Sequence, residues 1–138
     1  MMFFYKACLI SALSLRIISS AAPAELSTKN MNKELDTGLT VCSGTLHPAT
    51  GCVNFFFNGE SCVNFTGGLA FLYKQVSSAS VGPNIICTFY KSLGCNPSGS
   101  DSDMAVLSSG EYGFSSVPGL NGTIDFDNMA SSYSCSAF

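Results

Sequence analysis

The sequence DNMASS at residues 127–132 carries much of the information about the fold, because a degenerate copy, YKQVSS, stands 54 positions earlier at residues 73–78. Each copy follows a β-rich stretch that contains a cysteine. These stretches are at residues 41–42 for the first copy and residues 86–90 for the second. The spacing therefore predicts that the chain after its N-terminal segment is a duplication.

The N-terminal segment at residues 1–24 is typical of a secretory signal peptide. Lys6 precedes an apolar run, and small residues follow it. We expect cleavage before Glu25; cleavage after Ala22 is the alternative and would leave Pro23 first. Arg16 shortens the apolar run far below the roughly 20 residues that cross a bilayer. The sequence thus predicts a secreted, extracellular protein without stable membrane insertion.

Cleavage removes Cys8 and leaves an even number of cysteines, as in disulfide frameworks of small secreted proteins. The six are Cys42, Cys52, Cys62, Cys87, Cys95 and Cys135. We expect about three bridges, because reactive or metal-binding thiols suit a reducing compartment better. The sequence does not choose among the 15 connectivities that six cysteines allow. In the duplication, Cys42 and Cys52 are expected to correspond to Cys87 and Cys95.

Maturation also changes the charge, because Lys6 and Arg16 leave with the signal peptide. Four lysines then oppose nine acidic residues, which gives a net charge of −5. Binding to phosphate backbones or anionic lipid depends on clusters of Lys and Arg. The composition therefore argues against nucleic acid and membrane surfaces as partners.

Two sequons, at Asn64 and Asn121, match the acceptor pattern for N-glycosylation in a eukaryotic secreted protein. Asn96 fails the pattern because Pro97 follows it. The alternative interpretation is that both asparagines simply form turns beside neighbouring glycines. Either interpretation places the two side chains on the surface.

The mature chain divides into a polar N-terminal segment at residues 25–40 and a β-rich domain at residues 41–138. The polar segment suits a flexible lead-in, a short helix or a pro-segment. In the domain, apolar and polar residues alternate at 53–58 and 123–127, which predicts strands with one buried face. Glycine and serine clusters recur about every ten residues, as in an all-β sandwich or barrel.

The order of cysteines, short strands and Ser-Ser pairs over about residues 40–138 resembles small secreted cysteine-rich fungal proteins with a βγ-crystallin-like domain. The resemblance implies an all-β sandwich of two Greek-key motifs with four strands each, as repeats at about residues 41–82 and 83–138. Killer-toxin-like proteins and microbial calcium-binding crystallins share this fold.

The same resemblance implies a calcium motif of two Asn or Asp, two variable residues, Ser or Thr, and Ser, which residues 127–132 fit at every defined position. Ligands would come from both repeats, namely from Asp127, Asn128, the Met129 carbonyl, Ser131 and Ser77. These are oxygen donors of the kind that calcium prefers. The first copy departs from the motif, because Lys74 supplies a positive charge where a ligand is required. The alternative is structural: Ser-Ser hydroxyls close tight corners.

Residues for catalysis are sparse. His47 is the single histidine and precedes Pro48 in an expected loop, without a motif that supplies a nucleophile or an orienting partner. Asp125 and Asp127 would share one strand face, which is more typical of a solvated surface than of a glycosidase. We therefore expect no enzymatic activity and no required cofactor, with weak calcium binding as the alternative.

The run Phe55, Phe56 and Phe57 places Phe56 opposite to its neighbours, where it could join Phe71 or Tyr73 in a patch for a partner or glycan. We expect a monomeric, non-enzymatic interaction protein of a fungus, effector-like at a host or competitor interface. Its partner would be an extracellular protein or a cell-wall glycan. Two alternatives remain open: a killer-toxin-like antifungal protein and a weak calcium-binding structural protein.

Overall fold

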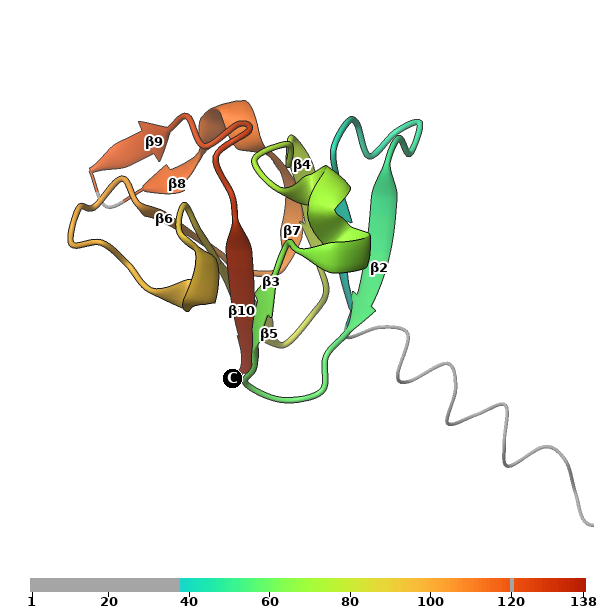
Figure 1. The fold of residues 1–138 in the computed structure, drawn as a ribbon, viewed down its shortest axis with the longest axis horizontal. Coiled ribbons are helices and arrows are strands. Elements are labelled where there is room, and N and C mark those ends of the chain that lie inside the picture. The colour runs from blue at the N-terminus through green and yellow to red at the C-terminus, as the bar shows by residue number, and fades with distance from the viewer. Residues whose placement is uncertain (1–37, 120) are drawn as a thin grey trace, which may run out of the picture.

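The computed structural model describes residues 38–119 and 121–138, which form two four-stranded antiparallel sheets and one short hairpin (Figure 1). The first sheet has the strand order β2-β1-β4-β7 and the second the order β3-β10-β5-β6, while β8 and β9 form the hairpin. The strands are β1 (Gly38–Cys42), β2 (Cys52–Phe56), β3 (Cys62–Asn64), β4 (Ser78–Val81), β5 (Ile85–Tyr90), β6 (Met104–Leu107), β7 (Gly110–Gly113), β8 (Val117–Gly119), β9 (Gly122–Ile124) and β10 (Ser132–Ala137). Short 3₁₀ helices connect them: η2 (Gly67–Leu72), η3 (Leu93–Cys95) and η4 (Phe114–Ser116). None of the helices in the described residues is long and apolar enough to span a membrane.

Each half of the chain contributes three strands to one sheet and one strand to the other. In the first half, β1, β2 and β4 lie together, whereas β3 pairs with β10 of the second half. In the second half, β5, β6 and β10 lie together, whereas β7 pairs with β4 of the first half. This strand order makes two interlocked Greek keys. The expected all-β sandwich of two four-stranded motifs is confirmed.

Two expected boundaries differ from the structure. Strand β1 begins at Gly38, so the last residues assigned to the polar segment 25–40 belong to the first sheet; the signal peptide and residues 25–37 lie outside the described residues. The expected strand at residues 123–127 ends at Ile124. Beyond it, the Asp127 amide donates a hydrogen bond to Asp125 Oδ1 at 3.0 Å, which turns the chain away from the sheet direction.

The core between the sheets is built largely from aromatic side chains. Phe89 packs edge-on against Phe114, with ring centroids 5.0 Å apart, and Phe114 packs edge-on against Phe126 at 6.2 Å. Edge-to-face packing satisfies the quadrupoles of the rings as well as burying their area. Strand β2 follows the expected alternation, because Phe55 packs inward while Phe56 is 61 % exposed.

The predicted three bridges are present, and two of them join residues that face each other across neighbouring strands. The bridges are Cys42–Cys52, Cys62–Cys95 and Cys87–Cys135. The first ties β1 to β2 and the third ties β5 to β10 at directly opposed positions. The second connects β3 to η3 and so crosses from the first half of the chain to the second.

The expected correspondence between the cysteines of the two halves is wrong. The Ser77 amide donates to the Cys42 carbonyl, and the equivalent Ser131 amide donates to the Tyr90 carbonyl. Cys42 therefore corresponds to Tyr90 and not to Cys87. The cysteines stand at different positions of the strand pattern in the two halves. Their spacing is therefore a poor guide to the repeat.

Candidate functional site

The two copies of the six-residue motif meet in space. The Lys74 amide donates to the Ala130 carbonyl at 2.8 Å, and the Asn128 amide donates to the Val76 carbonyl at 3.0 Å. Because Lys74 and Val76 stand 54 positions before Asn128 and Ala130, the two bonds are related by a local two-fold axis. The repeat identified in the sequence is therefore a real structural repeat, and it crosses the interface between the two halves.

These two hydrogen bonds define two corners, one at each copy of the motif. In the first, which we call the Asn128 corner, Asp127, Asn128 and Met129 lie beside Val76 and Ser77. All of its polar side chains carry oxygen donors of the kind that calcium prefers.

In the second, which we call the Lys74 corner, Lys74 lies beside Ala130 and Ser131. Ser77 follows Val76, the acceptor for the Asn128 amide, whereas Ser131 follows Ala130, the acceptor for the Lys74 amide. The five-residue calcium site stays a prediction.

The serine hydroxyls of the motif close the corners. Ser131 Oγ donates to the Lys91 carbonyl at 2.6 Å, Ser132 Oγ to the Ser92 carbonyl at 2.7 Å, and Ser78 Oγ to the Gly44 carbonyl at 2.5 Å. The acceptors belong to the loops that follow β5 and β1. Ser78 in the first half, and Ser131 and Ser132 in the second, therefore fix the loop of their own sheet, in agreement with the structural interpretation of the motif.

The carboxylate of Asp127 is the acidic group of the Asn128 corner. Asn128 Nδ2 donates to its Oδ2 at 3.0 Å, while its Oδ1 is buried without a hydrogen-bond partner among the described residues. Within that part of the chain, no three His, Cys, Asp or Glu side chains cluster as a metal site would require. Any cation at this corner would depend on amide, hydroxyl and carbonyl oxygens beside the Asp127 carboxylate, with the Asp125 carboxylate held nearby by the Asp127 amide.

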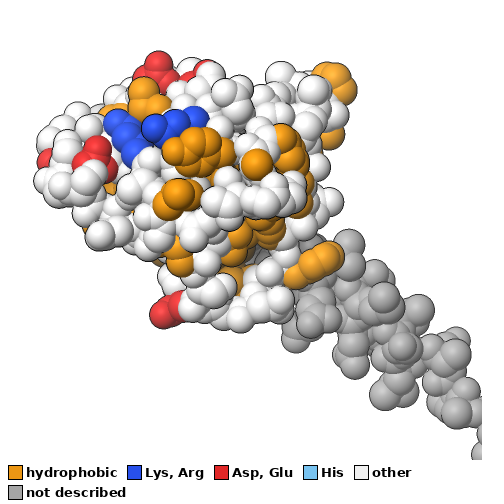
Figure 2. All heavy atoms as spheres, in the orientation of Figure 1, with side chains coloured by type: hydrophobic (Ala, Val, Ile, Leu, Met, Phe, Trp, Pro, Cys, Tyr) orange, Lys and Arg blue, Asp and Glu red, His pale blue; other side chains and the backbone are white. Residues whose placement is uncertain are grey.

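Both cations of the described residues, Lys74 and Lys91, flank this motif. Lys74 Nζ lies 5.7 Å from the centre of the Tyr73 ring, and Lys91 Nζ lies 5.7 Å from the centre of the Phe126 ring. Figure 2 shows the Lys side chains in blue, gathered on one face beside exposed hydrophobic groups. Their positive charge opposes the approach of a calcium ion, most directly at the Lys74 corner.

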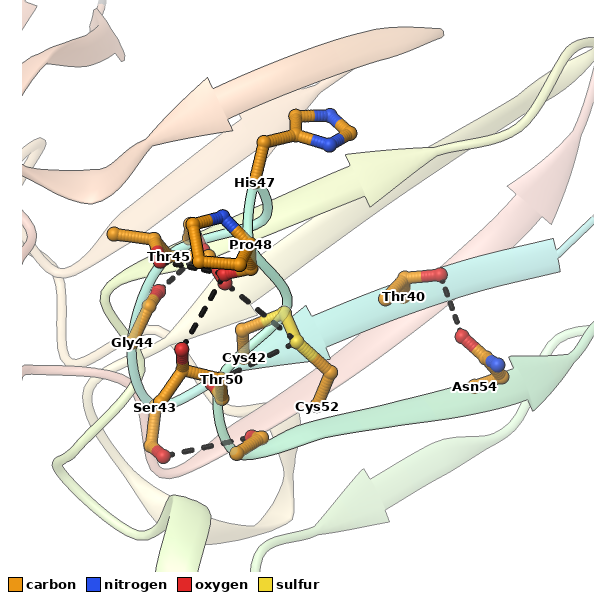
Figure 3. The surroundings of a disulfide bond; sticks show 12 residues. Thr40, Cys42, Ser43, Gly44, Thr45, His47, Pro48, Thr50, Cys52 and Asn54 are labelled. Atoms are coloured by element: carbon orange, nitrogen blue, oxygen red, sulfur yellow. Dashed lines mark hydrogen bonds between the residues drawn. A yellow bond between two sulfur atoms is a disulfide. The ribbon is translucent and has the colours of Figure 1, made fainter.

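His47 lies in the expected loop, at the tip of the connection between β1 and β2. Figure 3 shows the Cys42–Cys52 bridge at the base of this loop and His47 projecting away from it. His47 Nε2 lies 3.0 Å from Glu111 Oε1, and both side chains are more than half exposed. Among the described residues this carboxylate is the only side-chain hydrogen-bond partner of His47, and the contact joins the loop to β7.

Both sequon asparagines are exposed. Asn64 lies in β3, where its Oδ1 accepts a hydrogen bond from the Gly94 amide at 2.7 Å and its Nδ2 stays available. Asn121 lies in the turn of the β8–β9 hairpin. Both positions are accessible to a glycan.

Sequence reasoning singled out Phe56 but missed the groove beside it. A groove of about 370 Å³ opens at the ends of β2 and β3, and a second hollow of about 450 Å³ lies along β1 and β4. Phe56 lines both, together with Leu39, Asn54 and Phe55. Phe71 and Tyr73 are also exposed, but neither lines these hollows. The groove depends on which ends of two strands meet, and no local pattern in the sequence contains that information.

No protein-family model matches the chain, and no curated protein matches it. Three solved chains are similar to it. One of them comes from work on the evolution of the eye lens beta-gamma-crystallin domain fold. It has 18% sequence identity and a TM-score of 0.48 over 75% of this chain and 88% of that chain. The description of the fold given above rests on the strand order and on the three bridges.

Proposed function

We propose that the protein is a secreted, non-enzymatic interaction protein of a fungus that acts outside the cell, at the surface of a host or a competitor. The observation that carries the proposal is the exposure of Phe56, which lines two neighbouring hollows. A large aromatic side chain exposed on a rigid strand is a common anchor for binding, because it contributes apolar area with little loss of conformational entropy.

The three bridges support an extracellular role. They join β1 to β2, β3 to η3 and β5 to β10, so that each sheet holds at least one covalent link. Bridges of this kind persist in oxidising compartments and stabilise small domains against unfolding. They hold β2, which carries Phe56, against its neighbour β1 through Cys42 and Cys52.

The test uses the full chain expressed in a secreting yeast host and purified from the medium. The labelled protein is incubated with intact fungal cells and with plant cell walls, before and after reduction. We expect retention on at least one of these surfaces, loss of retention after reduction, and about tenfold weaker retention for Phe56→Ala. Phe71→Ala is the matched control, since Phe71 is exposed but lies away from both hollows. A protein that stays in the cells, or that binds neither surface, contradicts the proposal.

Fungal viability in the same titration separates the alternative function. Killing by the oxidised protein that disappears on reduction would favour a killer-toxin-like activity over an effector-like one. Binding without killing supports the interaction protein proposed here.

A further inference from the structure

Among the described residues, those that line the two hollows beside Phe56 carry no charged side chain. The walls are formed by apolar, amide and hydroxyl groups. An ionic ligand would lose part of its hydration there without gaining a partner of opposite charge from the lining. This lining therefore favours a neutral occupant.

Tyr133 lies in the wall of the groove and is 5 % exposed. Its ring packs against Phe55, Phe65 and Phe89, with centroids 5.1, 5.8 and 5.7 Å away. Its hydroxyl makes no hydrogen bond to any of the described residues, and burial alone raises the pKa of the phenol, so the group is a neutral donor and acceptor. The hydroxyl keeps contact with solvent at the wall of the groove, so a ligand that displaces this water must offer it a hydrogen bond.

Asn54 supplies a second oriented polar group at the rim. Thr40 Oγ1 donates to Asn54 Oδ1 at 2.7 Å across β1 and β2 (Figure 3), which fixes the amide and leaves its Nδ2 hydrogens free to donate. Asn58 and Ser61 add an amide and a hydroxyl to the wall of the groove. Together with Phe56 they place an apolar face next to several neutral hydrogen-bonding groups.

We propose that the groove beside Phe56 binds a neutral saccharide, which names the partner class of the interaction protein proposed above and rests on that function. A sugar ring has an apolar C–H face that packs on Phe56 and hydroxyls that both donate and accept hydrogen bonds, as Tyr133 and Asn54 require. A purely apolar ligand would leave these polar groups unpaired. The groove volume of about 370 Å³ lies at the lower end of the range for small-ligand sites. The second hollow gives room for a further sugar ring of the same saccharide.

The experiment measures retention of the secreted protein on four insoluble neutral polysaccharides: chitin, β-1,3-glucan, mannan and cellulose. Soluble oligosaccharides of the retained type are then titrated by calorimetry. We expect binding to at least one polymer, a loss of about tenfold in affinity for Phe56→Ala, and a loss of about fivefold for Tyr133→Phe, which removes only the hydroxyl. Phe71→Ala should bind like the parent protein, and melting temperatures of all variants should show that they fold.

Three outcomes overturn the inference. They are the absence of retention on all four polymers, retention that is unchanged in both Phe56→Ala and Tyr133→Phe, and displacement from cells by a neutral peptide but not by saccharide. Binding to cells that is lost after protease treatment of the cell surface would keep the proposed function and reject the saccharide. Absence of binding to cells, walls and polymers would reject both.

Discussion

Lys74 and Asn128 hold the same left-handed backbone conformation, with φ of 52° and 57°, at equivalent corners of the two Greek keys. Asparagine tolerates this conformation because its short side chain bonds locally, whereas lysine has the ordinary Cβ penalty. The corner is retained in the first half because the Lys74 amide donates to the Ala130 carbonyl at 2.8 Å. The two corners are geometrically alike and chemically different.

Lys74→Asn should stabilise the protein and create calcium dependence. In EDTA we expect a gain of about 1 kcal/mol in the free energy of unfolding, because asparagine relieves the left-handed strain. Calcium at ten times a dissociation constant of about 10⁻³ M should add about 1.4 kcal/mol. Chemical denaturation with and without calcium measures both effects.

Lys91→Asn is the matched control for this change. It removes the same charge from the same face, but position 91 does not have a positive φ. We expect no gain in EDTA. If the calcium response of Lys74→Asn equals that of the parent protein, Lys74 is not what limits binding at these corners.

The contribution of each bridge to the free energy of unfolding should increase with the length of the loop that it closes. The sequence separations are 10 for Cys42–Cys52, 33 for Cys62–Cys95 and 48 for Cys87–Cys135. Loop-closure entropy gives about 2.7, 3.7 and 4.1 kcal/mol respectively. Denaturation of the three paired Cys→Ala variants measures the order, and a larger loss from the shortest loop than from the longest would contradict the entropic account.

Gly51→Ala should destabilise the loop between β1 and β2. Gly51 has φ of 61°, and a Cβ there would clash with Ser43 Oγ. We expect a loss of about 1–3 kcal/mol, seen as a lower melting temperature. Gly68→Ala is the control, because a Cβ at that position meets no atom within 4 Å and should change stability by less than about 0.5 kcal/mol.

Tyr133 should make stability fall at high pH. Burial raises the pKa of its phenol above the ordinary value of 10.0, so above pH 10 the unfolded chain releases a proton that the folded chain keeps. The free energy of unfolding should then fall by about 1.4 kcal/mol per pH unit beyond the slope of Tyr133→Phe. Urea midpoints between pH 8 and 11 measure this difference; parallel curves for the two proteins would show that the phenol ionises freely in the fold.

Both sequons should carry glycans in a eukaryotic secreting host. Thr66→Ala and Thr123→Ala remove the acceptor patterns without touching Asn64 or Asn121, and so keep the bond from the Gly94 amide to Asn64 Oδ1. Each substitution should reduce the intact mass by one glycan. A parent protein with the mass of the bare chain would leave the asparagines as turn residues only.

The sequence predicted those parts of the fold that depend on local pattern. The alternation in β2 gave the inward side of Phe55 and the exposure of Phe56, and the 54-residue repeat gave the equivalence of Lys74 and Asn128. Glycine and serine clusters gave the spacing of the strands.

What could not be predicted depends on long-range register. Cys42 faces Cys52 and Cys87 faces Cys135 only because β1 pairs with β2 and β5 with β10 in one particular alignment. The groove beside Phe56 likewise forms where strands from both sheets end. No local pattern in the sequence therefore indicated that Tyr133 lies in its wall.

The exchange of β3 and β7 between the sheets has a consequence for the origin of such a chain. A single repeat cannot complete its own sheet, because its fourth strand comes from the other repeat. A half-length chain with this exchange would have to pair with an identical chain to complete both sheets. Joining the two halves in one chain makes that pairing intramolecular, so that folding does not depend on protein concentration.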